Sequence, residues 1–197
     1  MESNPYAAPL AELEEPSNIE PTFYVVGIRK FSILFVSTLG FYSIYWFYAN
    51  WKGYKEKYSE KIWPIARAIF SIFFAHSLFS KVQEKLDAEK QEYEWSPGSL
   101  ATIYVVLTIA GNVVDRLSMK EIWSPNSDIL SLVLVLPLFY TVLVAQRAIN
   151  YSEGDTEGAS NNTLTWVNYL WVLLGVVLWI LSVLGVLLIT GVIIIDA

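Results

Sequence analysis

One uncharged stretch indicates where this chain resides: Phe31-Ser-Ile-Leu-Phe-Val-Ser-Thr-Leu-Gly-Phe-Tyr-Ser-Ile-Tyr-Trp-Phe-Tyr-Ala-Asn-Trp51. Arg29 and Lys30 precede it, and Lys52 follows it. An uncharged apolar segment of about 20 residues is long enough to cross ~30 Å of hydrocarbon as a helix. Its second half is rich in aromatic rings and ends beside a lysine, which is typical of the membrane–water interface. The sequence therefore predicts a protein built into a membrane.

The composition of the whole chain supports this prediction. Of 197 residues, 54% are hydrophobic and only 16% are charged, whereas soluble domains carry about 25% charged residues. The net charge of −6 argues against nucleic-acid binding, which needs a basic face. The chain has no cysteine, so disulfides, thiolate chemistry and Cys-ligated metals are excluded.

Outside this stretch, apolar residues recur in segments of helical length. We predict an all-α fold, a polytopic integral membrane helical bundle with no β-sheet, in which three to five of five apolar segments span the bilayer. Residues 23–197 form this single membrane-embedded domain, after a disordered acidic tail, residues 1–22, with five Glu and no Lys or Arg. Pro137 should kink the fourth segment. The five segments are residues 24–48, 64–80, 99–114, 128–148 and 164–195.

The last segment is too long for one perpendicular crossing. At 1.5 Å per residue, its 32 apolar residues would extend for roughly 48 Å. It must therefore tilt, or leave the helix after Gly185 or Gly191. Small residues such as Gly175 and Gly185 would let a neighbouring helix approach closely.

A lysine-rich loop follows the aromatic cluster and is the best candidate for contact with lipid headgroups. Each lysine near an anionic leaflet contributes on the order of 1 kcal/mol of binding. We expect the bilayer, with its anionic headgroups, to be the main partner, and a membrane protein to be a possible second one. The lipid-interface candidates are Lys52, Lys55, Lys57, Lys61, Trp46 and Trp51.

Two ionisable residues, Arg67 and His76, lie well inside an apolar segment. Such intramembrane polar residues are functional candidates because they are costly to bury. A structural role is favoured for both. Arg67 lies one turn from the start of its segment, where it can reach the headgroups. The two residues are nine positions apart, so a single helix would carry them on opposite faces, and they would not form one site.

The distribution of positive charge bears on orientation. If all five segments span, Lys and Arg outside Arg67 divide six to each side, and the positive-inside rule decides nothing. If residues 24–48 form a hairpin bent at Thr38-Leu39-Gly40 and residues 64–80 lie at the interface, the division becomes ten against two. We favour this arrangement, with a cytoplasmic N-terminus. A five-span bundle remains the alternative.

The run from Thr38 to Lys52 resembles an element, TLGxYxxYWxYxNWK, of a family of uncharacterised bacterial inner-membrane proteins, a domain of unknown function. In that family an "RA-x-F…LF" segment follows, which here is Arg67-Ala-Ile-Phe70 through Leu78-Phe79. Residues between Asn161 and Gly185 also fit the pattern. The resemblance implies a multi-pass protein of the bacterial inner (cytoplasmic) membrane, and it implies no activity.

No catalytic constellation is recognisable. The single histidine excludes multi-His metal sites, and no nucleophile-elbow or phosphate-cradling glycine motif occurs. We therefore predict no catalytic residue, cofactor or metal site. The favoured function is a non-catalytic integral membrane protein that binds a partner or acts as an envelope accessory or sensor. The alternative is a small transporter or channel subunit, which a cavity lined by Asn112, Asp115 and Arg116 would favour.

Overall fold

The computed structural model describes residues 21–193, and these are helical with no β-strand among them, which confirms the all-α prediction. The predicted acidic tail falls almost wholly outside the described residues. Thr22, assigned to that tail, is already buried in the fold. The elements are α1 (Ile28–Ser37), α2 (Tyr42–Tyr58), α3 (Pro64–Ile69), α4 (Ser71–Ala88), α5 (Pro97–Ser118), α6 (Asn126–Ser152), the short 3-10 helix η1 (Ala159–Asn161) and α7 (Trp166–Ile189).

In the described part of the chain, three helices are long and apolar enough to cross a membrane: α5, α6 and α7, with 22, 27 and 24 residues. They correspond to the last three predicted segments. Helix α6 continues through Pro137. Helix α7 ends at Ile189, and Gly191 follows with φ of 71°, so the chain leaves the helix at one of the two predicted places.

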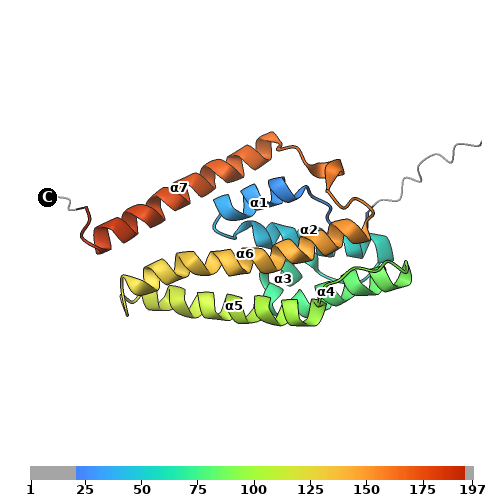
Figure 1. The fold of residues 1–197 in the computed structure, drawn as a ribbon, viewed down its shortest axis with the longest axis horizontal. Coiled ribbons are helices and arrows are strands. Elements are labelled where there is room, and N and C mark those ends of the chain that lie inside the picture. Colours follow the sequence, from blue (N-terminus) through green and yellow to red (C-terminus); the bar gives the residue numbers. More distant parts are fainter. Residues whose placement is uncertain (1–20, 194–197) are drawn as a thin grey trace, which may run out of the picture.

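The first predicted segment is not one helix. It breaks between α1 and α2, where Leu39 and Gly40 have φ of 52° and 86°. This left-handed conformation suits glycine, which has no Cβ to clash. The break confirms the bend predicted at Thr38-Leu39-Gly40, and the chain reverses there so that α2 runs back beneath α1 (Figure 1).

The second predicted segment also breaks, at Phe70, between α3 and α4. Helix α3 starts at Pro64 as predicted. Helix α4 continues to Ala88 and buries one face with helical spacing, from Ala75 through Leu78 to Leu86. Arg67 and His76 therefore lie on different helices, and the argument that one helix carries them on opposite faces was wrong.

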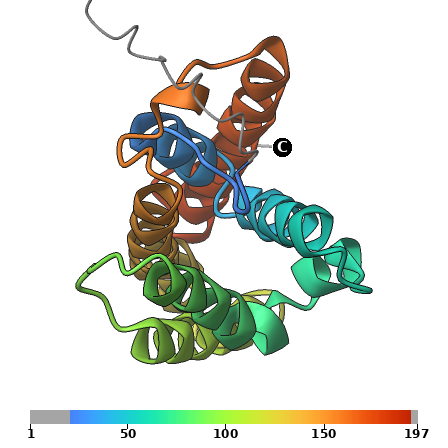
Figure 2. The same ribbon diagram turned by 90° about the vertical axis from the view of Figure 1, so that its right-hand side faces the viewer.

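Helices α5 and α6 pack side by side and antiparallel, while α1–α4 gather around the end where α6 finishes and α7 begins (Figure 1). The connection between α5 and α6 and the end of α7 lie at the opposite end. The view along the molecule shows α7 beside α1 and well separated from α5 (Figure 2). Residues 21–193 thus form three long helices with a compact group of shorter helices at one end.

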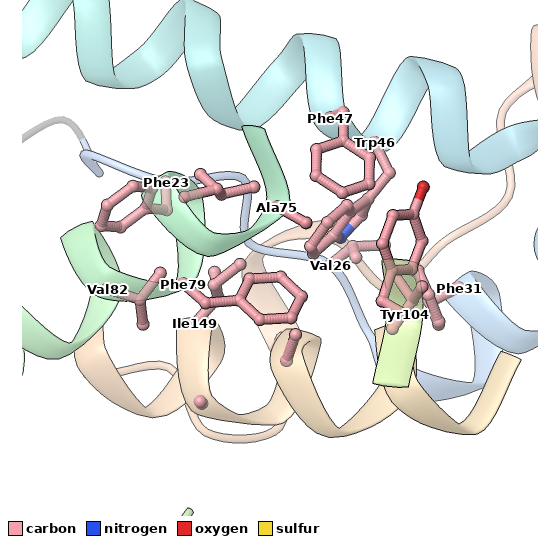
Figure 3. Close-up of a cluster of buried hydrophobic side chains, with 14 of the residues drawn as sticks. Phe23, Val26, Phe31, Trp46, Phe47, Ala75, Phe79, Val82, Tyr104 and Ile149 are labelled. Atoms are coloured by element: carbon pink, nitrogen blue, oxygen red, sulfur yellow. The ribbon is translucent and has the colours of Figure 1, made fainter. Parts of the chain in front are cut away.

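The core lies where that compact group packs against α5 and α6. Trp46 and Phe47 from α2 meet Phe79 from α4 and Tyr104 from α5 (Figure 3). The rings of Trp46 and Phe47 lie 4.9 Å apart in an edge-to-face arrangement, and Phe47 lies 5.3 Å from Tyr104. Ring pairs in this geometry contribute about 0.5–1.5 kcal/mol beyond their buried area.

Helix α7 is tied to the rest of the described chain mainly through α1. A Cβ added to Gly175 would lie 2.0 Å from the Ser37 carbonyl oxygen, so only glycine allows this approach. The close contact predicted for Gly175 is confirmed. At Gly185 a Cβ would meet nothing within 4 Å, so the prediction was wrong for that residue.

Candidate functional site: a lateral groove and a polar pocket

An extended segment, residues 22–27, crosses the compact group with its backbone bonded to side chains instead of a neighbouring strand. Asn150 both accepts from the Val26 N–H at 3.3 Å and donates to the Val26 carbonyl at 2.9 Å. Asn50 accepts from the Tyr24 N–H at 3.0 Å. Buried backbone groups must be paired, and here side-chain amides from α2 and α6 pair them. Residues 22–27 therefore have a single defined path over the core.

The same segment is held at both ends. Glu153 accepts from the Thr22 and Phe23 N–H groups at 3.1 and 2.9 Å, and pairs with Lys85 of α4 at 2.7 Å. At the other end Asn161 donates to the Val25 carbonyl at 2.9 Å and accepts from the Gly27 N–H at 3.1 Å. These contacts join α4, α6, η1 and the segment in one unit.

Trp46 and Trp51 are fully buried, which corrects the prediction that they lie at the lipid interface. The Trp46 indole donates to Gln146, whose amide nitrogen donates in turn to the Tyr24 carbonyl at 3.0 Å. Trp51 lies under Arg67, whose guanidinium carbon is 4.2 Å from the ring centroid. Protein contacts, not headgroups, therefore surround both rings.

The four lysines are exposed along the second half of α2 and just after it. Lys52 lies 3.8 Å from Glu56, and its side chain is 52% exposed. Exposed pairs of this kind contribute little, so Lys52 keeps most of its capacity to bind an anion. Contact of Lys52, Lys55, Lys57 and Lys61 with lipid stays a prediction.

The intramembrane polar candidates are not brought together. Arg67 stacks on Trp51 and on Phe74, 5.1 Å away. The His76 Nε2 lies 3.1 Å from the Thr102 hydroxyl on α5. Each therefore has a local structural contact on a separate helix.

An apolar groove of about 550 Å³ opens between α2, α3 and α7. Tyr45 and Tyr48 line it from α2, Ile69 lines it from α3, and Trp171 and Leu178 line it from α7. A groove of this size is in the range of small-ligand sites.

A polar pocket of about 400 Å³ adjoins the groove and shares Tyr45 and Tyr48 with it. Its wall includes Lys52 and Glu56 from α2 and Asn161 from η1. Gly53 also lines it. A Cβ at this position would lie 2.5 Å from the Thr22 carbonyl oxygen, so glycine allows residues 22–27 to pass close to α2. Tyr45 and Tyr48 therefore border both an apolar and a polar compartment.

Lys30 contacts Asn161, which forms part of the wall of the polar compartment. From the sequence, Lys30 is only one of the charges that flank the first apolar stretch. Its side chain is 4% exposed, and its ammonium donates to the Asn161 Oδ1 at 2.6 Å. Among the described residues no carboxylate lies within ion-pairing distance of it. A buried ammonium is costly unless paired. No sequence signal distinguishes Lys30 from Arg29, because its burial depends on η1, 131 positions away.

A second cleft, of about 300 Å³, lies between α5, α6 and α7. Asn112 and Asp115 line it, as the transporter alternative requires, whereas Arg116 is not part of its lining. Asp115 accepts a hydrogen bond from the Ser131 hydroxyl. Within the described part of the chain, no group of three or more His, Asp or Glu side chains is placed to hold a metal ion.

Comparison of the chain with protein-family models, with curated proteins and with solved structures gave no match in any of the three. The assignment therefore rests on the fold. It defines an all-helical integral membrane protein with three candidate spans and a groove open to the side of α7.

Proposed function

We propose that this chain is a non-catalytic integral membrane protein that binds a component of the bilayer in the groove between α2, α3 and α7. We further propose that it is a multi-pass protein of the bacterial inner membrane with a cytoplasmic N-terminus. The observation that carries the proposal is the groove itself, because it opens beside a candidate span and is lined almost entirely by apolar side chains.

The position of the groove along α7 supports this function. With a rise of 1.5 Å per residue, Trp171 and Leu178 lie about 8 and 18 Å along the helix from Trp166. One leaflet of hydrocarbon is about 15 Å deep. If Trp166 lies near the membrane surface, the groove is at the depth of acyl chains. The polar compartment, which includes Asn161, then lies at the depth of the headgroups.

The α1–α2 turn fits a hairpin that enters the bilayer and returns. Ser37 meets α7 at Gly175, about 14 Å from Trp166. Backbone groups at such depth need partners. Trp179 donates to the Val36 carbonyl at 2.8 Å, and the Thr38 hydroxyl donates to the Leu34 carbonyl at 2.7 Å. These bonds support the arrangement that places the lysine-rich parts on one side.

Labelling of single cysteines tests the arrangement, and the native chain has no background thiol. Cysteines at Ser59, Glu89, Ser124 and Gly158 would be exposed to an impermeant reagent from outside the cell. We expect only the Ser124 position to react. Reaction at Ser59 as well, with none at Glu89, would establish five spans and contradict the hairpin.

The transporter alternative is favoured by one observation, the lining of the second cleft by Asn112 and Asp115. It predicts proton or cation flux across proteoliposomes that hold the protein. The binding function predicts no flux above that of protein-free vesicles. A flux that disappears in the Asp115→Asn variant, but persists in a Glu121→Gln control outside the cleft, would overturn the binding function.

A further inference from the structure

We propose that the groove and the polar pocket together bind one anionic phospholipid, with an acyl chain in the groove and the phosphate-containing headgroup in the pocket. This inference rests on the proposed function and names the component that is bound.

The shape of the site matches an amphiphile. The apolar compartment, about 550 Å³, and the polar one, about 400 Å³, are both lined by Tyr45 and Tyr48. The two rings form the border, and their hydroxyls can bond to the ester region of a lipid while their carbon faces contact the chain. A purely apolar partner helix would leave the polar compartment without a counterpart.

The charges of the site select a negative headgroup. Lys52 lines the pocket, and Lys30 lies behind its Asn161 wall with one hydrogen bond to that amide. Two of the three N–H donors of the Lys30 ammonium have no partner among the described residues, and the side chain is 4% exposed. A phosphate in the pocket would meet Lys52 directly and would act on Lys30, which is not among the lining residues, only through space. Glu56 also lines the pocket and lies 3.8 Å from Lys52, but exposed pairs of this kind are weak, so Glu56 offsets the attraction only in part.

A phospholipid is also the occupant that the surroundings supply. The groove is open along the side of α7, and an 18-residue stretch of that span is only 6% buried in the protein. Lipid therefore reaches the groove without crossing the fold. The other candidate for the polar pocket is the acidic segment that precedes Pro21, which lines the pocket. Its glutamates make that segment a competitor for Lys52, and the Glu→Gln variants described below separate the two occupants.

Native mass spectrometry of the full chain in a neutral detergent tests the proposal. The protein would be mixed with equal amounts of phosphatidylglycerol and phosphatidylcholine. We expect one retained phosphatidylglycerol per chain. Lys52→Gln should weaken its retention about fivefold, the effect of one lysine at an anionic surface. Lys57→Gln is the matched control, because Lys57 is exposed on the same helix but does not line the pocket.

The apolar compartment is tested separately with Ile69→Trp. Ile69 is 63% exposed and lines the groove, so a larger ring there fills the groove without entering the core. Ile103→Trp is the control, because Ile103 is 49% exposed on α5 and outside the groove. We expect the lipid to be lost only in the first variant, with unchanged helix content in both.

Three results would overturn the proposal while leaving the binding function intact: equal retention of the two lipids, equal effects of the two lysine variants, or retained lipid in Ile69→Trp. Changing Glu12, Glu14, Glu15 and Glu20 to Gln in the full chain should leave retention unchanged. A several-fold gain would show that the acidic segment occupies the pocket, which also overturns the proposal. Failure of the binding function itself would appear as flux in proteoliposomes, which does not depend on lipid retention.

Discussion

The indole of Trp179 on α7 donates a hydrogen bond to the carbonyl oxygen of Val36 in the last turn of α1, over 2.8 Å. The last carbonyls of any helix lack intrahelical partners. This one accepts from the Leu39 N–H at 3.2 Å and also from a side chain 143 positions later in the chain. The bond lets a short helix end against an apolar span.

Removing the indole N–H should therefore destabilise the protein. Trp179→Phe removes one of the two hydrogen bonds that the Val36 carbonyl accepts and leaves the longer one, from the Leu39 N–H at 3.2 Å, so we expect a loss of about 0.5–1.5 kcal/mol in unfolding free energy. Reversible unfolding in detergent would measure the loss. Trp166→Phe is the control, because Trp166 is 74% exposed at the start of the same helix and should change stability little. Equal losses would mean that ring size, not the hydrogen bond, is responsible.

Gly175 should tolerate no side chain. Its missing Cβ would lie 2.0 Å from the Ser37 oxygen and 2.5 Å from the Ser37 carbonyl carbon, both of them backbone atoms that cannot rotate away. Gly175→Ala should thus push α7 from α1 and lower the melting temperature. Gly185→Ala meets open space and should be neutral or stabilising, because alanine favours helix by about 1 kcal/mol over glycine. A neutral Gly175→Ala would contradict the contact.

Gln146 should contribute strongly to the stability of the fold. It joins the Trp46 indole, the Tyr24 carbonyl and Asn150, all in the core. Gln146→Leu leaves the Trp46 indole N–H and the Tyr24 carbonyl without this partner, whereas Asn150 keeps its bonds to Val26. We expect a loss of roughly 2–4 kcal/mol in unfolding free energy.

Gln83 provides a matched comparison, because it also accepts from a tryptophan, Trp95, at 2.6 Å in a partly buried position. Gln83→Leu should cost less than half as much, since water can replace the lost partner. Similar costs for the two variants would contradict a dry polar network around Gln146.

The loop that carries Asn161 should loosen in acid. Burial acts to raise the pKa of Asp155, but hydrogen bonds from Ser160 and Ala159 outweigh it and hold the pKa below its usual 3.8. A lowered pKa means that the carboxylate stabilises the loop at and above about pH 4, and that this contribution is lost as the pH falls through the pKa in the folded protein.

Hydrogen-exchange protection of the Ser160 N–H, corrected for the intrinsic rate, measures this effect. Protection should fall below pH 4 in the native chain and be low at every pH in Asp155→Asn. Asp87→Asn, at the exposed end of α4, should behave as the native chain. Protection that does not change with pH would contradict the role of the Asp155 carboxylate.

Features that depend only on residues close together in the sequence could be predicted without the structure. The three spans follow from uninterrupted apolar length, and the bend at Thr38-Leu39-Gly40 and the helix start at Pro64 follow from local conformational preferences. The close approach at Gly175 was also foreseen, although the same reasoning failed at Gly185. Hydrophobicity and backbone preference are properties of short stretches, so they can be read without the fold.

Only the tertiary structure decided which side chains face protein. Trp46 and Trp51 belong to an aromatic cluster typical of the membrane–water interface, yet both are buried. Gln146 and Arg67, from other helices, contact their rings. The break at Phe70 lies within an apolar run that has no glycine or proline there. The burial of Lys30 depends on Asn161. Such environments are created by residues about 15 to more than 100 positions away, and no local pattern encodes them.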